Sequence, residues 1–387
     1  MSDPRVTRWA RRLVAAGAGF FLAFHLAVAT GAGRRFVVVL GLYGFVLHVL
    51  FGKAYALVPA YFDRDLSVPQ APAAQFPLSV LGTVGLALAP VAPGWVGAIG
   101  SVCWALGVAV FVGAVGWTVR TNPTGAETGT GGANTHRQPV DRLANAVLPI
   151  ALVYLAAAAV AVALPTVGRR WLVAAQVSHL LGAGTAALFV FGVGFRLFPR
   201  FLVAEPPRSL VRLVLPAGAL APALLAGGLF DRWLLLLGGV LEALAVVGFA
   251  VAYVALFRRS DRRRIGFYAV LGAVGYGAVG VGLAVMAVLD GRDPALVRAH
   301  YRTMLAGFLG LTIVGATFQF YPPTVGRSRL STDRTAGGVI GLLGVGLGGQ
   351  LLGLVSGHSL LVTGGAATGI AGAVLYCWLL GAAFRRR

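Results

Sequence analysis

Long apolar segments separated by short polar ones make up most of this chain. An apolar helix of about 20 residues is long enough to cross the roughly 30 Å hydrocarbon core of a bilayer. Segments of this kind fall at residues 10–31, 35–61, 75–94, 97–119, 143–165, 171–198, 209–230, 233–257, 265–289, 297–323, 336–356 and 360–384. The pattern therefore predicts twelve membrane-spanning helices.

Three of the predicted spans share the spacing Gly-x7-Gly-x6-Pro, and we call them the template helices. In each one an aromatic residue (Tyr55, Phe195 or Phe318) precedes the Pro by four places. The pattern occurs at Gly44, Gly52 and Pro59, at Gly184, Gly192 and Pro199, and at Gly307, Gly315 and Pro322. A pattern that recurs at so long a period indicates internal repetition. We predict an all-α, polytopic integral membrane protein whose twelve transmembrane helices form three four-helix repeats, at residues 1–120, 143–260 and 261–387.

Residues 121–142 join the first two predicted repeats. This segment is rich in Gly, Thr, Asn and Pro and has no apolar periodicity, so it is expected to be a flexible cytoplasmic linker. The template glycines lie eight residues apart on one helix face, where a neighbouring helix or a flat ligand can approach the backbone. Close helix packing is the favoured interpretation.

Composition and charge agree with a membrane protein. Hydrophobic residues make up 58% of the chain, charged residues 11%, and the mean hydropathy is +0.84. The net charge of +20 lies in the connections between spans, where it signals orientation rather than nucleic-acid binding. Connections assigned to the cytoplasm carry 22 arginines, counting Arg212 just beyond one of them, against eight on the other side. We therefore expect a cell-membrane protein with both termini in the cytoplasm and a lipid bilayer as its surroundings.

The start of the chain also resembles a secretory signal, because four arginines precede an apolar run and an Ala-x-Ala sequence at 27–29. Cleavage is not expected, since it would leave the first repeat with three helices. The two cysteines, Cys103 and Cys377, lie inside spans and form no metal or redox motif. The strong preference for Arg over Lys, with abundant Ala, Gly and Val, suggests a prokaryotic source.

Histidines are the main candidates for chemistry. Neutral imidazole is a common ligand of haem iron, copper and zinc. His179, His300 and His25 are predicted near the outer face as cofactor-binding residues, and His48 and His358 are further candidates for a metal. The alternative for each is a structural histidine bound to a backbone carbonyl or placed among lipid headgroups.

Four other polar residues fall within or beside predicted spans. Glu242 is the only carboxylate well inside one, so it could serve a proton relay or cation site, or a bond between helices. Arg196 is expected mainly to anchor the cytoplasmic end of its span, although it could hold an anionic group. Arg302 and Gln319 are expected to line a polar interior.

Two template helices carry a family resemblance. HYRTMLAGFLGLTIVGATFQFYP, from His300 to Pro322, resembles the tenth helix of the catalytic subunit of heme-copper oxidases, and the nitric-oxide reductase branch is the most similar. HLLGAGTAALFVFGVGFRLFP, from His179 to Pro199, resembles the sixth helix. A haem- and copper-associated family linked to nitric-oxide response is similar in the same way. The resemblance implies twelve helices in three arcs, cytoplasmic termini and a haem near the outer face.

The ligand set departs from that family at three places. Arg302 stands where the second His of a His-x-His pair would be, and the seventh span lacks an adjacent His pair. The second span has no His near its outer start, because His48 lies deeper. These departures argue against a complete oxygen reductase and against copper, and they fit a divergent relative that keeps one haem or metal, or none.

Three hypotheses remain open. The first is a divergent heme-copper-oxidase-like protein that uses a haem or metal in redox or diatomic-gas chemistry, alongside other respiratory or redox subunits. The second is a cofactor-free permease or channel that uses Glu242, Arg196 and Gln319. The third is a non-catalytic assembly subunit. The sequence does not decide whether the protein is an enzyme.

Overall fold

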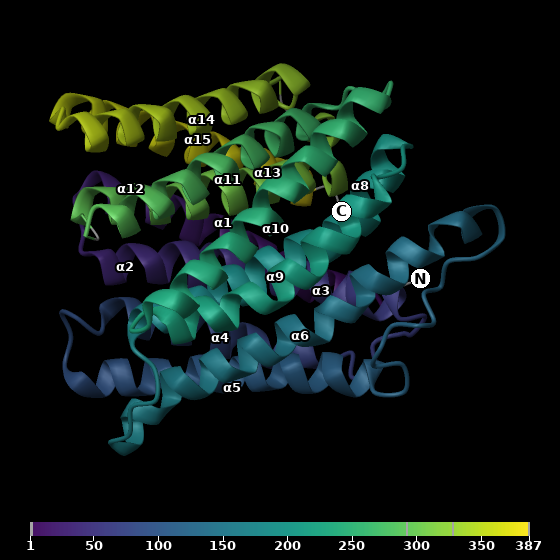
Figure 1. Cartoon of the computed structure of the whole chain (residues 1–387), viewed down its shortest axis with the longest axis horizontal. Coiled ribbons are helices and arrows are strands. Elements are labelled where there is room, and N and C mark those ends of the chain that lie inside the picture. The colour runs from purple at the N-terminus through teal and green to yellow at the C-terminus, as the bar shows by residue number, and fades with distance from the viewer. Residues whose placement is uncertain (1–2, 292, 327–328, 386–387) are drawn as a thin grey trace. The chain divides into compact units, whose positions relative to one another are not determined.

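The computed structural model describes residues 3–291, 293–326 and 329–385. All the regular secondary structure in this part of the chain is helical, and it contains no strand, as Figure 1 shows. The α-helices are α1 (Pro4–Ala29), α2 (Arg34–Val38), α3 (Leu47–Tyr61), α4 (Ala71–Leu88), α5 (Gly94–Val119), α6 (Gln138–Ala163), α7 (Ala174–His179), α8 (Leu188–Leu202), α9 (Arg208–Gly228), α10 (Arg232–Arg259), α11 (Ile265–Leu289), α12 (Pro294–Arg302), α13 (Thr312–Phe320), α14 (Asp333–Ser356) and α15 (Ser359–Phe384). Short 3-10 helices are η2 (Gly132–Arg137), η3 (Leu164–Val167) and η6 (Pro323–Val325).

Twelve helical segments of the described chain are long and apolar enough to cross a membrane. They coincide with the twelve predicted spans to within a few residues at most ends, so the prediction of a polytopic all-α membrane protein is confirmed. Apolar residues also face outward along these helices, as at Leu81, Val153 and Leu360, which is expected of a surface in contact with lipid.

Each template helix contains a π-helical segment that joins two α-helices. These segments are η1 (Val39–Val46), η4 (Leu180–Ala187) and η5 (Thr303–Leu311). Each of them holds the first glycine of its template. π-Helical turns are rare and frequently mark functional sites, and the apolar periodicity of the sequence did not predict them.

The first template glycine packs against an aromatic residue of the preceding long helix. A Cβ added there would come within 2.6–2.7 Å of that residue: Gly44 faces Phe20, Gly184 faces Tyr154 and Gly307 faces Tyr276. Only a residue without a side chain lets the helices approach so closely.

The second template glycine packs against a backbone carbonyl of the same preceding helix. A Cβ would lie 2.6 Å from the oxygen of Ala10 at Gly52, 3.0 Å from that of Ala144 at Gly192, and 2.5 Å from that of Gly266 at Gly315. In all three places the carbonyl residue precedes the aromatic one by ten positions. The packing of each template helix on its predecessor therefore recurs three times, while the grouping into three four-helix repeats stays a prediction.

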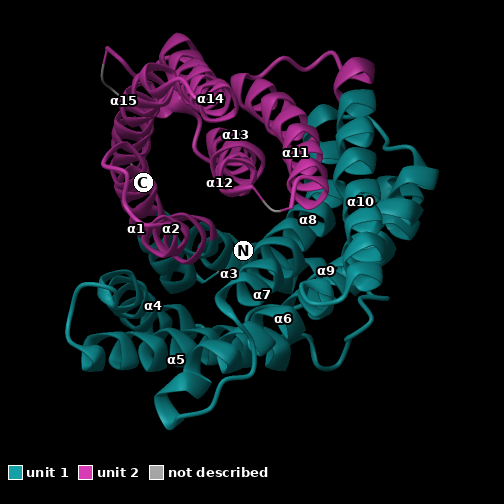
Figure 2. Ribbon diagram, turned by 60° about the vertical axis from the view of Figure 1, so that its left-hand side comes forward, with its two compact units in different colours: residues 1–14, 47–256 teal, residues 15–46, 257–387 magenta. Residues whose placement is uncertain are grey.

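The chain divides into two compact units (Figure 2). Unit 1 comprises residues 1–14 and 47–256, and unit 2 comprises residues 15–46 and 257–387. These units cut across the predicted repeat boundaries. In unit 1, α4 pairs with α5, and α6 packs between α5, α8 and α9. In unit 2, the rod formed by α12, η5 and α13 is contacted by α11, α14 and η1.

Candidate functional site

The three template helices differ four residues after the second glycine. This position holds Ala56 in the first copy, Arg196 in the second and Gln319 in the third. Arg196 lies on α8 in unit 1 and is 4% exposed. A buried guanidinium is costly unless its charge and its N–H groups are matched, so its surroundings decide its role.

Arg196 is held by groups from three parts of unit 1, which are α3, the segment 121–142 and α6. Its Nη1 donates to the carbonyl of Tyr61 at 2.9 Å and to Oδ1 of Asn145 at 2.5 Å. Its Nη2 donates to the carbonyl of Thr128 at 3.0 Å, and its Nε lies 3.7 Å from a carboxylate oxygen of Asp141. The guanidinium also lies over the Tyr61 ring, 4.2 Å from its centroid. Both terminal nitrogens are thus bound within the protein, which supports a structural role rather than a place in a polar path.

Asp141 supplies the negative charge of this cluster. It is 1% exposed and makes a bidentate pair with Arg200, whose Nη2 and Nη1 donate at 2.7 and 3.1 Å. The Thr130 hydroxyl donates to the same carboxylate at 2.6 Å. Charge-assisted, bidentate bonds of this kind are among the stronger polar interactions in proteins. One carboxylate therefore pairs with two guanidiniums, and we call Asp141, Asn145, Arg196, Arg200 and Thr130 the charged cluster.

The segment 121–142 contributes to the charged cluster. Thr128 and Thr130 are buried, and so is Asn122, whose Nδ2 donates to the carbonyls of Phe62 at 3.2 Å and Glu127 at 2.7 Å. The flexibility expected of this segment stays a prediction. Its packed residues nevertheless show that it does more than connect two helices, because it supplies bonds to Arg196 and Asp141.

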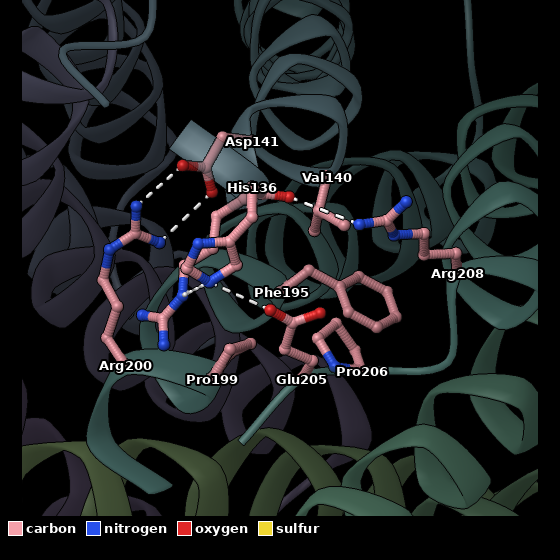
Figure 3. Close-up of a pocket in the computed structure, with 10 residues that line it drawn as sticks. His136, Val140, Asp141, Phe195, Pro199, Arg200, Glu205, Pro206 and Arg208 are labelled. Carbon is pink, nitrogen blue, oxygen red and sulfur yellow. Dashed lines mark hydrogen bonds and ion pairs between the residues drawn. The ribbon is translucent and has the colours of Figure 1, made fainter. Parts of the chain in front are cut away.

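A small pocket lies beside the charged cluster (Figure 3). His136 pairs with Glu205 at 2.9 Å, and Arg208 donates to the His136 carbonyl at 3.4 Å. Asp141 and Arg200 form another part of its wall. The pocket holds about 10 Å³, close to the space that one water molecule needs. It is too small for an organic substrate.

His179 and His300, the leading cofactor candidates, share one feature. The Nδ1 of His179 lies 2.8 Å from the carbonyl of Ala175, and the Nδ1 of His300 lies 2.8 Å from the carbonyl of Gly280. A carbonyl only accepts hydrogen bonds, so the proton sits on Nδ1 and the lone pair on Nε2. Metal-binding histidines are commonly oriented in this way, and a bond to a backbone carbonyl is equally what the structural alternative for these two residues predicts. His179 belongs to unit 1 and His300 to unit 2.

His25, the third cofactor candidate, is 3% exposed in unit 2. Both ring nitrogens are covered, and neither has a hydrogen-bond partner among the described residues. The ring stands edge-on to Phe21 and Phe24, and a Cβ at Gly369 would lie 2.7 Å from Nδ1. Cofactor binding by His25 gains no support from this packing and stays a prediction.

The two metal candidates are not brought into a shared site. His48 is fully buried in unit 1 beside Phe51, whereas His358 is exposed at the turn before α15 in unit 2. Within residues 3–291, 293–326 and 329–385, no group of three or more His, Cys, Asp or Glu residues could hold a metal ion. Metal binding by His48 or His358 gains no support from this arrangement.

Glu242 and Gln319 are both inward-facing. Glu242 is 9% exposed on α10, and neither carboxylate oxygen has a hydrogen-bond partner in the described chain. Gln319 lies against α11, where its Nε2 would be 2.6 Å from a Cβ at Gly266, and its Oε1 likewise has no described partner. A carboxylate without hydrogen-bond partners inside a membrane span is costly, so a functional role is the default hypothesis for Glu242.

Arg302 is the second buried arginine and lies in unit 2. It is 5% exposed, and its Nη1 donates to Oε1 of Gln350 at 3.2 Å. No carboxylate of the described chain lies within ion-pair distance of it. Arg302 therefore brings an unbalanced positive charge into unit 2, which a bound anionic group would neutralise.

The sequence analysis missed Asp141, Asn145 and Thr130. A local signal was present, because Asp141 and Asn145 lie one turn apart at the start of an otherwise apolar helix and so share one face. Their partner Arg196 lies 51 residues beyond Asn145, and no local pattern links the two.

No protein-family model matches this chain, and comparison with curated proteins finds no match either. The resemblance to heme-copper oxidases accordingly stays a prediction from the sequence.

Proposed function

We propose that this membrane protein binds a haem through histidines of its template helices and acts in redox chemistry or in the handling of a diatomic gas. The observation that carries the proposal is the shared orientation of His179 and His300, whose Nδ1 atoms are tied to carbonyls and whose Nε2 atoms carry the lone pair. Each residue is a candidate axial ligand within its own unit.

The helix geometry beside these histidines supports the same proposal. His179 directly precedes η4, and His300 lies three residues before η5. A π-helical segment changes the direction in which adjacent side chains point, and such segments are frequent at functional sites. The template glycines inside η4 and η5 also offer backbone surface without side chains, which a flat ring system can approach.

In unit 2 the residues near His300 suit an anionic cofactor. Arg302 lies two residues further on and is buried with no described carboxylate beside it. A haem carries carboxylate groups that Arg302 and Gln350 would bind, with His300 as iron ligand. Bound haem would supply one-electron chemistry and a coordination position for a gas. The electrons would come from a redox partner subunit in the same membrane.

Absorption spectra of the full chain purified in detergent test this proposal. They are recorded after air oxidation and again after dithionite reduction. We expect a Soret band that shifts on reduction and is lost or weakened in His300→Ala or His179→Ala. His136→Ala is the matched control, because it removes an exposed histidine outside the template helices. A folded, colourless wild-type protein reconstituted with hemin would refute haem binding.

Glu242 favours a second candidate, a cofactor-free permease or channel. Its two oxygens lack partners in the described chain although it lies inside a predicted span. A carboxylate in this position can carry a proton or a cation. Proton flux in proteoliposomes that is lost in Glu242→Gln but kept in Glu205→Gln, which changes an exposed glutamate, would support this candidate.

We further propose that the protein resides in the cell membrane with both termini in the cytoplasm. The distribution of arginines between the two sets of connections supports this orientation. A reporter that is active only in the periplasm should be inactive when it is fused to the C-terminus. It should also be inactive when it is inserted into the connection between α10 and α11.

A further inference from the structure

We propose that a groove between the first two turns of α6 and α9 binds one anionic phospholipid, with the headgroup at the arginines and an acyl chain along the groove floor. The groove has a volume of about 510 Å³ and lies entirely in unit 1. It is lined by Pro139, Val140, Arg142, Leu143, Ala146, Arg208, Val211 and Arg212. It is distinct from the small pocket of Figure 3, although Val140 and Arg208 border both.

The charge of the groove is uniformly positive. Arg142, Arg208 and Arg212 are all exposed, and no acidic residue lines the groove. None of the three forms an ion pair with a described residue. Nearby arginines behave differently, since Arg200 is neutralised by Asp141. Three arginines without carboxylate partners at one membrane surface form a site for an anionic headgroup.

The floor of the groove is apolar. Pro139, Leu143 and Ala146 lie on one face of α6, and Val211 faces them from α9. Both helices continue from here into predicted spans. A charged rim above an apolar floor at the start of two spans matches a phospholipid, whose headgroup stays at the interface while its chain enters the bilayer. A soluble phosphate would use only the rim.

The start of α9 adds polar donors to the rim. It has no side chain that caps its N-terminus, whereas α12 and α14 are capped by Asp293 and Thr332. The first N–H groups of an uncapped helix need acceptors, and phosphate oxygens commonly supply them. A lipid phosphate in the groove would satisfy donors that the protein itself leaves without a side-chain cap.

Native mass spectrometry of the delipidated full chain tests this proposal, with phosphatidylglycerol, phosphatidylcholine and inorganic phosphate as separate probes. We expect retained phosphatidylglycerol, weak retention of phosphatidylcholine and no effect of phosphate alone. Each Arg→Gln change at 142, 208 or 212 should weaken binding about fivefold, because one basic residue near a membrane surface contributes about 1 kcal/mol. The triple variant should therefore bind roughly 100-fold less tightly.

The matched control removes the same charge elsewhere. Arg258, Arg262 and Arg264 are exposed near the start of α11 and do not line the groove, so their triple change to Gln should leave phosphatidylglycerol binding unaltered. Ala146→Phe fills the floor while keeping every arginine, and it should also weaken lipid binding. An equal loss of phosphatidylglycerol binding in the control and groove variants would overturn the proposal. So would an effect of inorganic phosphate alone, or unaltered lipid binding in Ala146→Phe.

Discussion

The template helix α7–η4–α8 in unit 1 and its counterpart α12–η5–α13 in unit 2 share their glycine packing but differ at the end that follows it. Four residues after the second glycine, Arg196 enters the charged cluster, whereas Gln319 has an Oε1 atom without a described partner. The preceding helices explain the difference. α6 begins at Gln138, six residues before Ala144, while α11 begins at Ile265, one residue before Gly266.

The additional turn at the start of α6 contains Asp141, the carboxylate of the charged cluster. Asp141 lies three residues before Ala144 within α6, and Asn145 follows it. In α11 the residue after Gly266 is Phe267, which cannot accept a hydrogen bond from a guanidinium through its side chain. The same glycine packing is thus followed by the charged cluster in unit 1 and by an uncharged helix end in unit 2. The difference depends on how far the preceding helix extends.

Asp141→Asn should cause the largest loss of stability. It removes the carboxylate that pairs with both Arg196 and Arg200, and breaking a buried ion pair typically costs about 3–5 kcal/mol. The free energy of unfolding in mixed micelles, measured by SDS titration, would reveal the loss. Glu205→Gln, which affects an exposed pair with His136, is the control and should change it little. Equal effects would contradict the importance of the charged cluster.

Asn145→Ala should have the next largest effect. The Asn145 side chain accepts from Arg196 and donates to the carbonyls of Tyr61 at 2.7 Å and Gly125 at 3.2 Å. Leaving buried partners unsatisfied costs about 1–3 kcal/mol. The same titration measures it, with the exposed Asn134→Ala as control. A loss no greater than in that control would show that water replaces the amide without cost.

Gly315→Ala should destabilise the protein more than Gly192→Ala. The added Cβ would lie 2.5 Å from the carbonyl oxygen of Gly266 in the first case and 3.0 Å from that of Ala144 in the second. Overpacking of this kind costs about 1–3 kcal/mol. The difference in thermal unfolding temperature in detergent checks the order. Gly341→Ala, where no atom lies within 4 Å of the new Cβ, should be neutral or stabilising.

Glu127→Gln should have the smallest effect. Glu127 pairs with Arg64 at 2.7 Å, but the two side chains are 59% and 28% exposed. Exposed ion pairs contribute about 0–1 kcal/mol and are screened by salt. The change in unfolding temperature should be small and should vanish at high ionic strength, in contrast to that of Asp141→Asn.

The spans could be predicted because their signal is local. Twelve apolar stretches of the right length needed no knowledge of their neighbours, and the template glycines correctly indicated close helix packing. The charged cluster could not be predicted in the same way. The carbonyl that binds Arg196 belongs to Tyr61, 135 residues away, and only the folded chain brings them together.

The histidines show the same limit. Sequence reasoning placed both His25 and His179 near the predicted outer face as cofactor-binding candidates. Burial separates them, since His25 is covered by Phe21, Phe24 and Gly369 while His179 is partly exposed. Side-chain packing of this kind depends on which helices meet, and the order of spans along the chain does not reveal it.

The charged cluster also has a consequence for biosynthesis. Tyr61, Thr128, Asp141 and Asn145 all precede Arg196 in the chain. When the ribosome reaches Arg196, every one of these partners has already been made, and the helices that bear Asp141 and Tyr61 are available to receive it. The guanidinium of Arg196 is therefore synthesised only after the carboxylate with which it pairs.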